Sequence, residues 1–251
     1  MRAPHQLVHS RTRVRDRYAL MPLEGFPTSR LPSWAGCDVR VLASPALGAQ
    51  FVQYLIDVPP GQRGDFPPDG QTETFHYVLT GTGQFLNGHG VERGLHPGAF
   101  GLTPPERGIS ITAREPLRLL VLRKRYESAP GIEPYAGHYG RESDVPRQVW
   151  ADNPHSLLQT LIPDDLAYDL AMNIFTFDPG FGLPIVETHV MEHGLYVLQG
   201  KGLYFLDDQW MEVERDDFIW MGPYCPQSFY ATGGEPVRYL YYKNVNREIP
   251  L

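Results

Sequence analysis

Apolar and polar residues alternate over short distances along most of the chain, and glycine or proline interrupts many of the apolar runs. These runs are rich in valine, isoleucine, tyrosine and phenylalanine, which favour extended strands. YVLTGTGQF from Tyr77 and YVLQGKGLYFL from Tyr196 each predict a strand, a glycine turn and a return strand. The pattern therefore predicts an all-β fold of short antiparallel strands joined by hairpins.

The pattern occurs twice along the chain, with a constant shift of 119 residues. The matching positions are Pro60 and Gly61 with Pro179 and Gly180, Gly81 with Gly200, and Gly83 with Gly202. Farther along, the shift is one residue larger, and LRLLVLR from Leu117 lies against VRYLYYK from Val237. Because sheets of this kind protect their edges by closing, the duplication predicts two tandem double-stranded β-helix (jelly-roll) barrels.

A segment without periodicity separates the two repeats. We expect an N-terminal barrel at residues 1–130, a linker at 131–157 and a C-terminal barrel at 158–251. A chain of 251 residues, of which 42% are hydrophobic, is long enough to give each barrel its own core.

Charge and composition exclude several classes of partner. The net charge is −7, and no run of lysine and arginine interleaves with aromatic residues, so we expect no nucleic-acid partner. The first residues are polar and basic, and no apolar run approaches membrane-spanning length, which predicts a soluble, cytoplasmic protein without a membrane partner. Cys37 and Cys225, one in each half, are expected to be buried thiols.

A carboxylate and two imidazoles are concentrated in LPIVETHVMEHGLYVLQG. Glu187 and His189 are two residues apart in a run of β-branched residues, so on a strand both point to one face. The spacing from His189 to His193 would also suit a helix, but Pro184 and Gly194 argue against one. We therefore expect a strand, a turn at residues 191–192, and a new strand that begins at His193.

A fourth ligand is expected from the strand after GPYCPQSFY begins, where Gln227 offers an amide oxygen. Glu187, His189, His193 and Gln227 would form a nitrogen and oxygen site without sulfur, which suits Mn(II), Fe(II) or Ni(II) and, less exclusively, Zn(II). Four protein ligands leave positions for water or substrate, as catalysis by a metal requires.

The alternative is that these residues are ordinary polar side chains at the end of a strand. The sequence repeat argues against this alternative. In the aligned register, the first half has Pro68, Gly70 and Thr74 at the positions of Glu187, His189 and His193, and it has Ile109 near the position of Gln227. One copy has all four ligands and the other has none, as expected when one barrel keeps a site and the other becomes structural. Glu73 and His76 in the first half lie outside this register.

Tyr239 and Lys243 are four residues apart in a predicted strand and therefore share a face. If that face lines the barrel interior, Lys243 is a cation near the metal that can hold a substrate carboxylate or pass a proton. The alternative is an ordinary surface lysine.

Several longer strings carry a resemblance to a known family. They are ASPALGAQFVQYL and ETFHYVLTG in the first half, and ETHVMEHGLYVLQGKGLYFLDDQW, WMGPYCPQSFYA and RYLYYKNVNRE in the second. In these strings the chain resembles the (S)-ureidoglycine aminohydrolases, a bicupin family of manganese enzymes in purine (allantoin) breakdown. The resemblance implies metal ligands at Glu187, His189, His193 and Gln227, and substrate contacts from Tyr239 and Lys243.

The implied reaction is hydrolytic deamination of (S)-ureidoglycine to (S)-ureidoglycolate and ammonia, with Mn²⁺ or another divalent transition metal as cofactor. The expected substrate is a small anionic ureido compound, bound by Glu187, Gln227, Tyr239 and Lys243. Glu187 or Lys243 would carry the proton, and the sequence does not choose between them. Members of the family have Asn and His where this chain has Ala171 and Asn173, which leaves a related ureido or amino acid substrate open.

Two other functions compete with this one: another cupin metalloenzyme, such as an isomerase or a dioxygenase, and a non-catalytic barrel that binds small molecules. Bicupins commonly assemble through exposed strands, so we expect a homo-oligomer.

Overall fold

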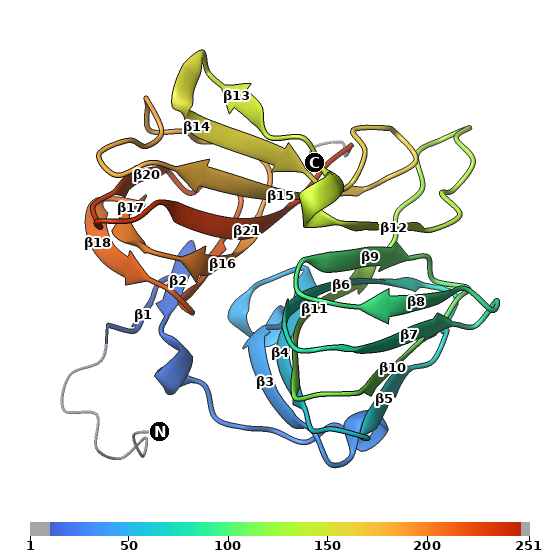
Figure 1. Cartoon of the computed structure of the whole chain (residues 1–251). Coiled ribbons are helices and arrows are strands. Elements are labelled where there is room, and N and C mark those ends of the chain that lie inside the picture. Colours follow the sequence, from blue (N-terminus) through green and yellow to red (C-terminus); the bar gives the residue numbers. More distant parts are fainter. Residues whose placement is uncertain (1–10, 247–251) are drawn as a thin grey trace. The chain divides into compact units, whose positions relative to one another are not determined.

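The computed structural model of the chain describes residues 11–246 and consists of strands, short 3-10 turns and loops (Figure 1). Residues 1–10 and 247–251, which begin and end the two predicted barrels, lie outside the described residues. The chain forms two compact units. The first barrel comprises Pro27–Asp144 and Asp165–Asp169, and the described parts of the second barrel are 11–26, Val145–Asp164 and 170–246.

The first barrel has two antiparallel sheets. One sheet, in the order β12-β9-β6-β11-β4-β3, contains β3 (Asp38–Ala43), β4 (Phe51–Val58), β6 (Thr72–Thr80), β9 (Ala99–Thr103), β11 (Leu117–Arg125) and β12 (His138–Arg141). The other, in the order β5-β10-β7-β8, contains β5 (Arg63–Phe66), β7 (Gly83–Asn87), β8 (Glu92–Leu95) and β10 (Ile109–Ala113). The 3-10 turns are η3 (Pro32–Trp34), η4 (Pro45–Leu47) and η5 (Glu142–Asp144).

Alternating side chains of both sheets fill the first core. On β10, Ile109 and Ile111 are buried, and they pack with Phe85 and Val121 in one apolar cluster. Trp34 completes this core: a Cβ on the residue at Gly64 would lie 2.0 Å from the Trp34 ring. Truncation of so large a buried side chain costs roughly 3–5 kcal/mol, so η3 is part of the barrel and not a decoration on it.

The second barrel repeats this plan. Its larger sheet, in the order β1-β2-β19-β16-β21-β15-β14-β13, contains β1 (Arg13–Val14), β2 (Tyr18–Met21), β13 (Gln148–Trp150), β14 (Asn153–Thr160), β15 (Leu170–Phe177), β16 (His193–Gln199), β19 (Phe218–Met221) and β21 (Val237–Asn244). Its smaller sheet, in the order β18-β17-β20, contains β17 (Lys201–Leu206), β18 (Gln209–Glu214) and β20 (Gln227–Ala231). The described residues before β13 also include the 3-10 turn η2 (Leu23–Gly25).

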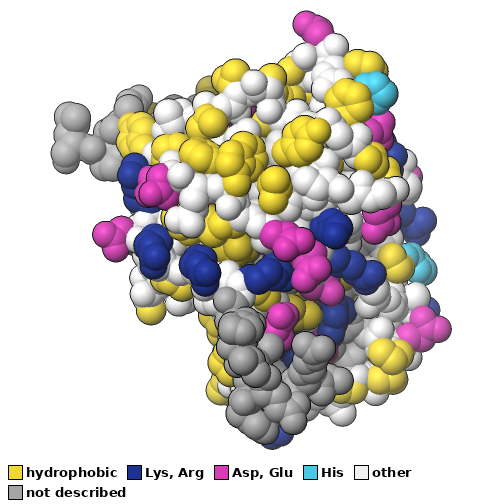
Figure 2. Space-filling view, turned by 90° about the vertical axis from the view of Figure 1, so that its left-hand side faces the viewer, with side chains coloured by type: hydrophobic (Ala, Val, Ile, Leu, Met, Phe, Trp, Pro, Cys, Tyr) yellow, Lys and Arg dark blue, Asp and Glu magenta, His cyan; other side chains and the backbone are white. Residues whose placement is uncertain are grey.

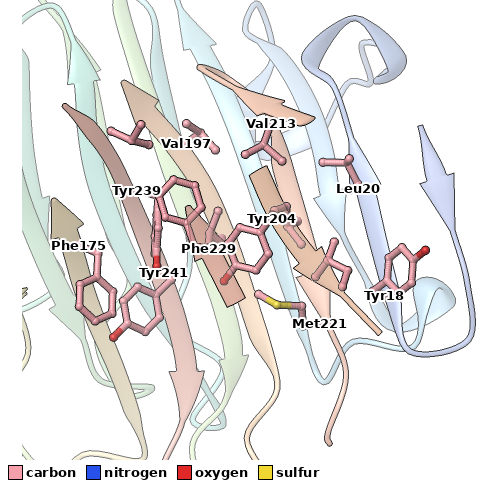
Figure 3. Packing of buried hydrophobic residues seen from close by; sticks show 14 of the residues in the cluster. Tyr18, Leu20, Phe175, Val197, Tyr204, Val213, Met221, Phe229, Tyr239 and Tyr241 are labelled. Carbon is pink, nitrogen blue, oxygen red and sulfur yellow. The ribbon is translucent and has the colours of Figure 1, made fainter. Parts of the chain in front are cut away.

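The second core is more aromatic than the first. Figure 3 shows the rings of Tyr204, Phe229, Tyr239, Tyr241 and Phe175 gathered between the strands. The ring centroids of Phe229 and Tyr239 lie 5.3 Å apart in an edge-to-face arrangement, and those of Phe175 and Tyr241 lie 5.5 Å apart in a stack. Such pairs prefer these geometries and add to the burial of their apolar surface.

The repeat is visible in the backbone as well as in the sequence. Gly81 and Gly200 occupy the same place after β6 and β16, with φ of +84° and +77°. A side chain at Gly81 would lie 2.0 Å from the carbonyl oxygen of Pro116, and one at Gly200 would lie 2.8 Å from that of Pro236. Both turns therefore require glycine for its positive φ and for close backbone approach. The predicted all-β fold of two jelly-roll barrels is confirmed.

The boundaries of the units differ from the predicted division at 1–130, 131–157 and 158–251. Strand β2 pairs with β19 of the second barrel, so this part of the first 130 residues belongs to the C-terminal unit. Arg11 reinforces the arrangement by donating two hydrogen bonds to Asp217, at 2.5 and 2.9 Å. The predicted linker also contains strands: β12 joins the first barrel, whereas β13 and β14 join the second. The pairings of β2 with β19 and of β12 with β9 are non-local, and local periodicity does not reveal them.

One face of the surface and the two cysteines can be compared with the sequence. On the face in Figure 2, lysine and arginine side chains lie among aspartate and glutamate side chains and do not form a continuous basic surface. Cys37 and Cys225 are both free thiols and both buried, as predicted. Among the described residues, the structure has no helix that is long and apolar enough to cross a membrane.

Candidate active site

The second barrel encloses a cavity of about 540 Å³. It is lined by Trp150, Phe175, Leu183, Ile185, Val186, Glu187, Thr188, His189, Met191, His193, Tyr204, Gln227, Tyr239, Tyr241 and Lys243. All six residues singled out from the sequence are among them. The structure therefore brings together side chains that come from a loop and from three different strands.

Strand β21 supplies one wall of the cavity. Tyr239, Tyr241 and Lys243 are at every second position along it, and all three line the cavity. Figure 3 shows the rings of the two tyrosines among the core residues. His193 on β16 lies directly opposite Lys243 in the strand register. Because directly opposed residues point to the same face, the imidazole and the ammonium group enter the same space. The expected shared face of Tyr239 and Lys243 is thus present, and it faces the interior.

Two backbone predictions for the ligand segment have different outcomes. A new strand does begin at His193, as predicted, and no helix joins it to His189. The predicted strand through Glu187 and His189 is wrong: 178–192 is irregular, and isolated bridges and single backbone hydrogen bonds connect it to β20. One bridge joins Glu187 and Gln227, whose backbone N–H and C=O groups exchange hydrogen bonds of 2.8 and 2.9 Å. The loop is therefore attached at the ligand residue itself.

Three of the four predicted ligands converge. The amide nitrogen of Gln227 lies 3.1 Å from Nε2 of His189 and 3.3 Å from Nε2 of His193. The two imidazole rings are stacked, with centroids 4.8 Å apart. Burial lowers the pKa of both histidines, that of His193 to about 3, and so favours the neutral imidazole that metals bind.

These separations fit a metal centre. Ligand atoms about 2.1 Å from one ion lie roughly 3.0 Å apart in octahedral and about 3.4 Å apart in tetrahedral geometry. Tyr204 donates a hydrogen bond of 3.1 Å to the amide oxygen of Gln227. A half-turn of that amide would direct its oxygen toward the imidazoles and leave its N–H groups facing Tyr204.

The fourth predicted ligand is less closely placed. Among the described residues, no three His, Cys, Asp or Glu side chains form a group tight enough to hold a metal, so the Glu187 carboxylate does not join the two histidines directly. It nevertheless lines the same cavity, from the irregular loop. Burial raises the pKa of Glu187, and the nearby Lys243 lowers it. The donors that do converge, from His189, His193 and Gln227, are of the nitrogen and oxygen kind that a divalent metal binds.

The cavity is polar at its ligand end, and aromatic and aliphatic side chains line the rest of it. Lys243 has no hydrogen-bond or ion-pair partner within 11–246, so its ammonium group is available to an anion. Burial strongly raises the pKa of Tyr239 and Tyr241, which keeps both hydroxyl groups protonated. Asn173 on β15 lies directly opposite Tyr241 and donates a hydrogen bond of 3.2 Å to its hydroxyl, although Asn173 does not line the cavity itself.

Sequence reasoning missed several cavity residues. Trp150, Phe175, Tyr204 and Tyr241 all line the cavity, and none was assigned to it beforehand. Tyr241 carried a usable signal, since it lies between Tyr239 and Lys243 at period two. Tyr204 did not, because its contact with Gln227 depends on how β17 pairs with β20.

Comparisons with known proteins place this geometry in a family. Residues 173–242, within the second barrel, match the cupin domain family. The chain is 32% identical to (S)-ureidoglycine aminohydrolase of Escherichia coli (strain K12), over 93% of this chain and 90% of that protein. It is also 32% identical to (S)-ureidoglycine aminohydrolase of Arabidopsis thaliana, over 92% of this chain and 76% of that protein. The crystal structure of protein Ylba from E. coli has 30% identity and a TM-score of 0.86, with 100% of both chains covered.

Two jelly-roll barrels from one duplicated sequence, with a histidine-containing cavity in the second, define a bicupin. The chain belongs to the (S)-ureidoglycine aminohydrolase family, whose members are hydrolases.

Proposed function

We propose that the protein hydrolyses (S)-ureidoglycine to (S)-ureidoglycolate and ammonia in purine catabolism, with a divalent metal, Mn²⁺, in the second barrel. The observation that carries this proposal is the convergence of all six predicted residues on one cavity, in a chain that matches (S)-ureidoglycine aminohydrolases over more than nine-tenths of its length.

The metal would be held by Glu187, His189, His193 and Gln227. A bound divalent ion supplies Lewis acidity and a fixed point for orienting an anionic substrate. Its donor set is free of sulfur, which suits Mn²⁺ better than a thiolate-preferring metal. The chain contributes two neutral imidazoles, since burial suppresses their protonation.

The substrate is a small carboxylate that also carries a ureido group and an amine. Lys243 is an available ammonium group on the cavity wall, so it binds the substrate carboxylate. Tyr239, four residues before Lys243 on the same face of β21, presents a protonated hydroxyl that donates to the ureido oxygen. The aromatic walls exclude bulk water and thereby strengthen both contacts.

Loss of the amine requires a proton on the departing nitrogen, and addition of water requires that a proton be removed. Besides the two histidines and the tyrosines, whose hydroxyl groups stay protonated, the ionisable side chains that line the cavity are Glu187 and Lys243. Burial raises the pKa of Glu187 above its ordinary value, against the opposing effect of Lys243, and a carboxyl group is a common general acid or base. We assign the proton transfer to Glu187 and the anchoring of the carboxylate to Lys243.

The direct test combines metal analysis with an ammonia assay on freshly made (S)-ureidoglycine, after subtraction of its spontaneous decay. We expect manganese and enzymatic ammonia release in the wild-type protein, and the loss of both in His189→Ala. His89→Ala removes an exposed histidine of the first barrel and serves as the matched control, which should keep both. Ammonia release by metal-free His189→Ala at the wild-type rate would refute the proposal.

A homo-oligomer is the proposed assembly. Ile185 and Val186 at the cavity mouth are 64% and 50% exposed, and apolar side chains at such exposure favour contact with another copy. Sedimentation equilibrium of the full chain tests this, and a monomer at micromolar concentration would contradict it.

A further inference from the structure

The first barrel contains its own cavity, of about 260 Å³. Its polar lining residues are His76, Arg93, Tyr139, Arg141 and Asp144, and the rest of the wall is glycine and apolar side chains. All of them belong to the first barrel. The proposed hydrolysis makes no use of this cavity, although the barrel lacks the ligands of the second site.

Residues in register on three neighbouring strands form the inner wall of this cavity. His76 on β6 and Tyr139 on β12 both lie directly opposite Gly101 on β9, which lies between them. Opposed residues point to one face of a sheet, so the two rings meet over the glycine. A Cβ at Gly101 would lie 2.6 Å from His76 Cε1 and 2.5 Å from Tyr139 Cδ1. Gly101 therefore makes room for both rings.

His76 is held firmly but is not fully satisfied. Its side chain is 2% exposed, and its ring stacks on Phe85 with centroids 4.7 Å apart. Its Nδ1 atom is buried and has no hydrogen-bond partner among the described residues. Unpaired polar atoms in protein interiors are uncommon and unfavourable, and they are often explained by a bound group. The imidazole is uncharged, because burial lowers its pKa to about 3.

Two arginines lie at the open end of the cavity. Arg93 is two residues before the buried Leu95 on β8, and Arg141 is two residues after Tyr139 on β12. Since side chains alternate along a strand, each arginine emerges on the side that faces the barrel interior. Neither guanidinium group has a hydrogen-bond or ion-pair partner in the part of the chain that the structure describes. Asp144, which accepts a hydrogen bond of 3.0 Å from Ser143, is also at the rim.

We propose that this cavity of the first barrel binds a small monocarboxylate. Guanidinium groups bind carboxylates through paired N–H donors, and Arg93 and Arg141 supply two such groups without competing partners. The charge of Asp144 reduces the sum at the rim to a single positive charge, which matches a monocarboxylate better than a phosphate dianion. His76 and Tyr139 form the polar inner wall that receives the far end of the molecule.

Titration calorimetry with glycolate tests the assignment. Every protein in the series carries Lys243→Ala, which removes the cation of the second cavity, and thermal melting verifies that each is folded. We expect glycolate to bind this background and to bind at least about tenfold more weakly after Arg93→Gln and Arg141→Gln together. Arg114→Gln, an exposed arginine of the same barrel that does not line the cavity, should bind as the background does.

Three results would overturn the proposal. The first is no detectable binding of glycolate to the Lys243→Ala background at millimolar concentration. The second is unchanged binding in the double arginine variant. The third is tighter binding of inorganic phosphate than of glycolate through the same arginines, which would make the site a phosphate site.

Discussion

The two barrels differ most where the cavity of the second barrel opens. In the first barrel, β5 is a regular strand that pairs with β10 over four residues. In the second barrel, the irregular segment 178–192 takes the corresponding place and touches β20 at two isolated bridges, Gly182 with Tyr230 and Glu187 with Gln227. A regular strand directs its side chains alternately to two faces, whereas an irregular segment can direct Glu187 and His189 to one cavity while its backbone stays attached. The site therefore lies where the second barrel has an irregular segment in place of a regular strand.

The aligned positions show the same contrast in their side chains. Thr74 and Arg123 face each other on β6 and β11, as His193 and Lys243 do on β16 and β21. Arg123 lies over the ring of Phe66 at 4.5 Å, so the cation of the first barrel is used in packing. Lys243 has no such contact within the described chain and is left for an anion.

The strongest test of this contrast gives the second barrel the residue of the first. We expect His193→Thr to lose bound metal and to lower the rate of ammonia release roughly 10³-fold or more, because several kcal/mol of charge stabilisation go with the metal. Metal analysis and the ammonia assay measure the two effects. The reverse exchange, Thr74→His, is the control: it adds one imidazole to a barrel without the other ligands and should leave metal content per chain as in wild type. An active, metal-loaded His193→Thr protein would show that His193 is not a ligand.

A second pair of variants compares the roles of the two cations, Lys243 and Arg123. We expect Lys243→Ala to lower kcat/KM roughly 10- to 100-fold, as for the loss of a hydrogen bond to a charged group. Most of this change should appear in KM, since the carboxylate is anchored before and during reaction. Arg123→Ala should keep wild-type kcat/KM and lose stability, because it removes the contact with Phe66 and the hydrogen bond of 3.3 Å to Thr74. Equal kinetic losses in both variants would mean that the two cations do not differ in role.

How much the sequence predicted depends on whether a feature is local. The start of β16 at His193 and the shared face of Tyr239 and Lys243 follow from alternation within a few residues, and both are present. The loop around Glu187 has the β-branched content of a strand, and only its pairing with β20 shows that it is irregular. The place of β2 beside β19 depends on residues about 200 positions apart, which no local pattern encodes.

The cavity of the first barrel makes the same point. His76 was set aside because it lies outside the register of the metal ligands, and in the structure it does correspond to the apolar Leu195: His76 faces Val121, as Leu195 faces Tyr241. Its significance comes from Gly101 on a neighbouring strand, which the sequence alone does not place beside it. The sequence thus shows that His76 is a polar residue at a core position, but the reason for it lies on another strand.

Replacing His76 by its counterpart gives a prediction about stability. The unfolded chain binds a proton at His76 near pH 6.5, whereas the folded chain does so only near pH 3, because burial disfavours the charged ring. The wild-type protein therefore loses stability from this group as pH falls below 6.5. Between pH 7 and pH 5, the unfolding free energy of the wild-type protein should fall by about 2 kcal/mol more than that of His76→Leu. Urea unfolding of metal-free protein at the two pH values measures this.

The matched control is His89→Leu, at an exposed histidine of the same barrel, which should keep the wild-type pH dependence. Tyr139, Arg93, Arg141 and Asp144 share the cavity with His76, but all remain in both proteins and cancel in the comparison. The same pH dependence in His76→Leu and wild type would mean that His76 takes up its proton without unfolding.

A buried glutamate at matching positions supplies the last and smallest difference. Glu73 in the first barrel contacts Lys124 at 3.3 Å and accepts a hydrogen bond of 2.6 Å from Tyr135, and Lys124 also contacts Asp169. Its counterpart Glu192 in the second barrel instead accepts a hydrogen bond from the indole of a tryptophan. The first barrel thus encloses two carboxylates around one ammonium group, an excess of negative charge.

That excess has a pH signature opposite in direction to the one at His76. Burial raises the pKa of Glu73 to about 8, Lys124 lowers it and Asp169 raises it, so the folded state retains a proton that the unfolded state releases near pH 4.5. Stability from this group is complete below pH 4.5 and is lost as pH rises toward 8. The side chain in Glu73→Gln cannot ionise. Between pH 5.5 and pH 8.5, we therefore expect the unfolding free energy of this variant to fall by on the order of 1 kcal/mol less than that of wild type. The control is Glu106→Gln, at an exposed glutamate, which should show the wild-type pH dependence in the same urea titrations. If Glu73→Gln also showed the wild-type pH dependence, Lys124 would fully offset the Glu73 charge.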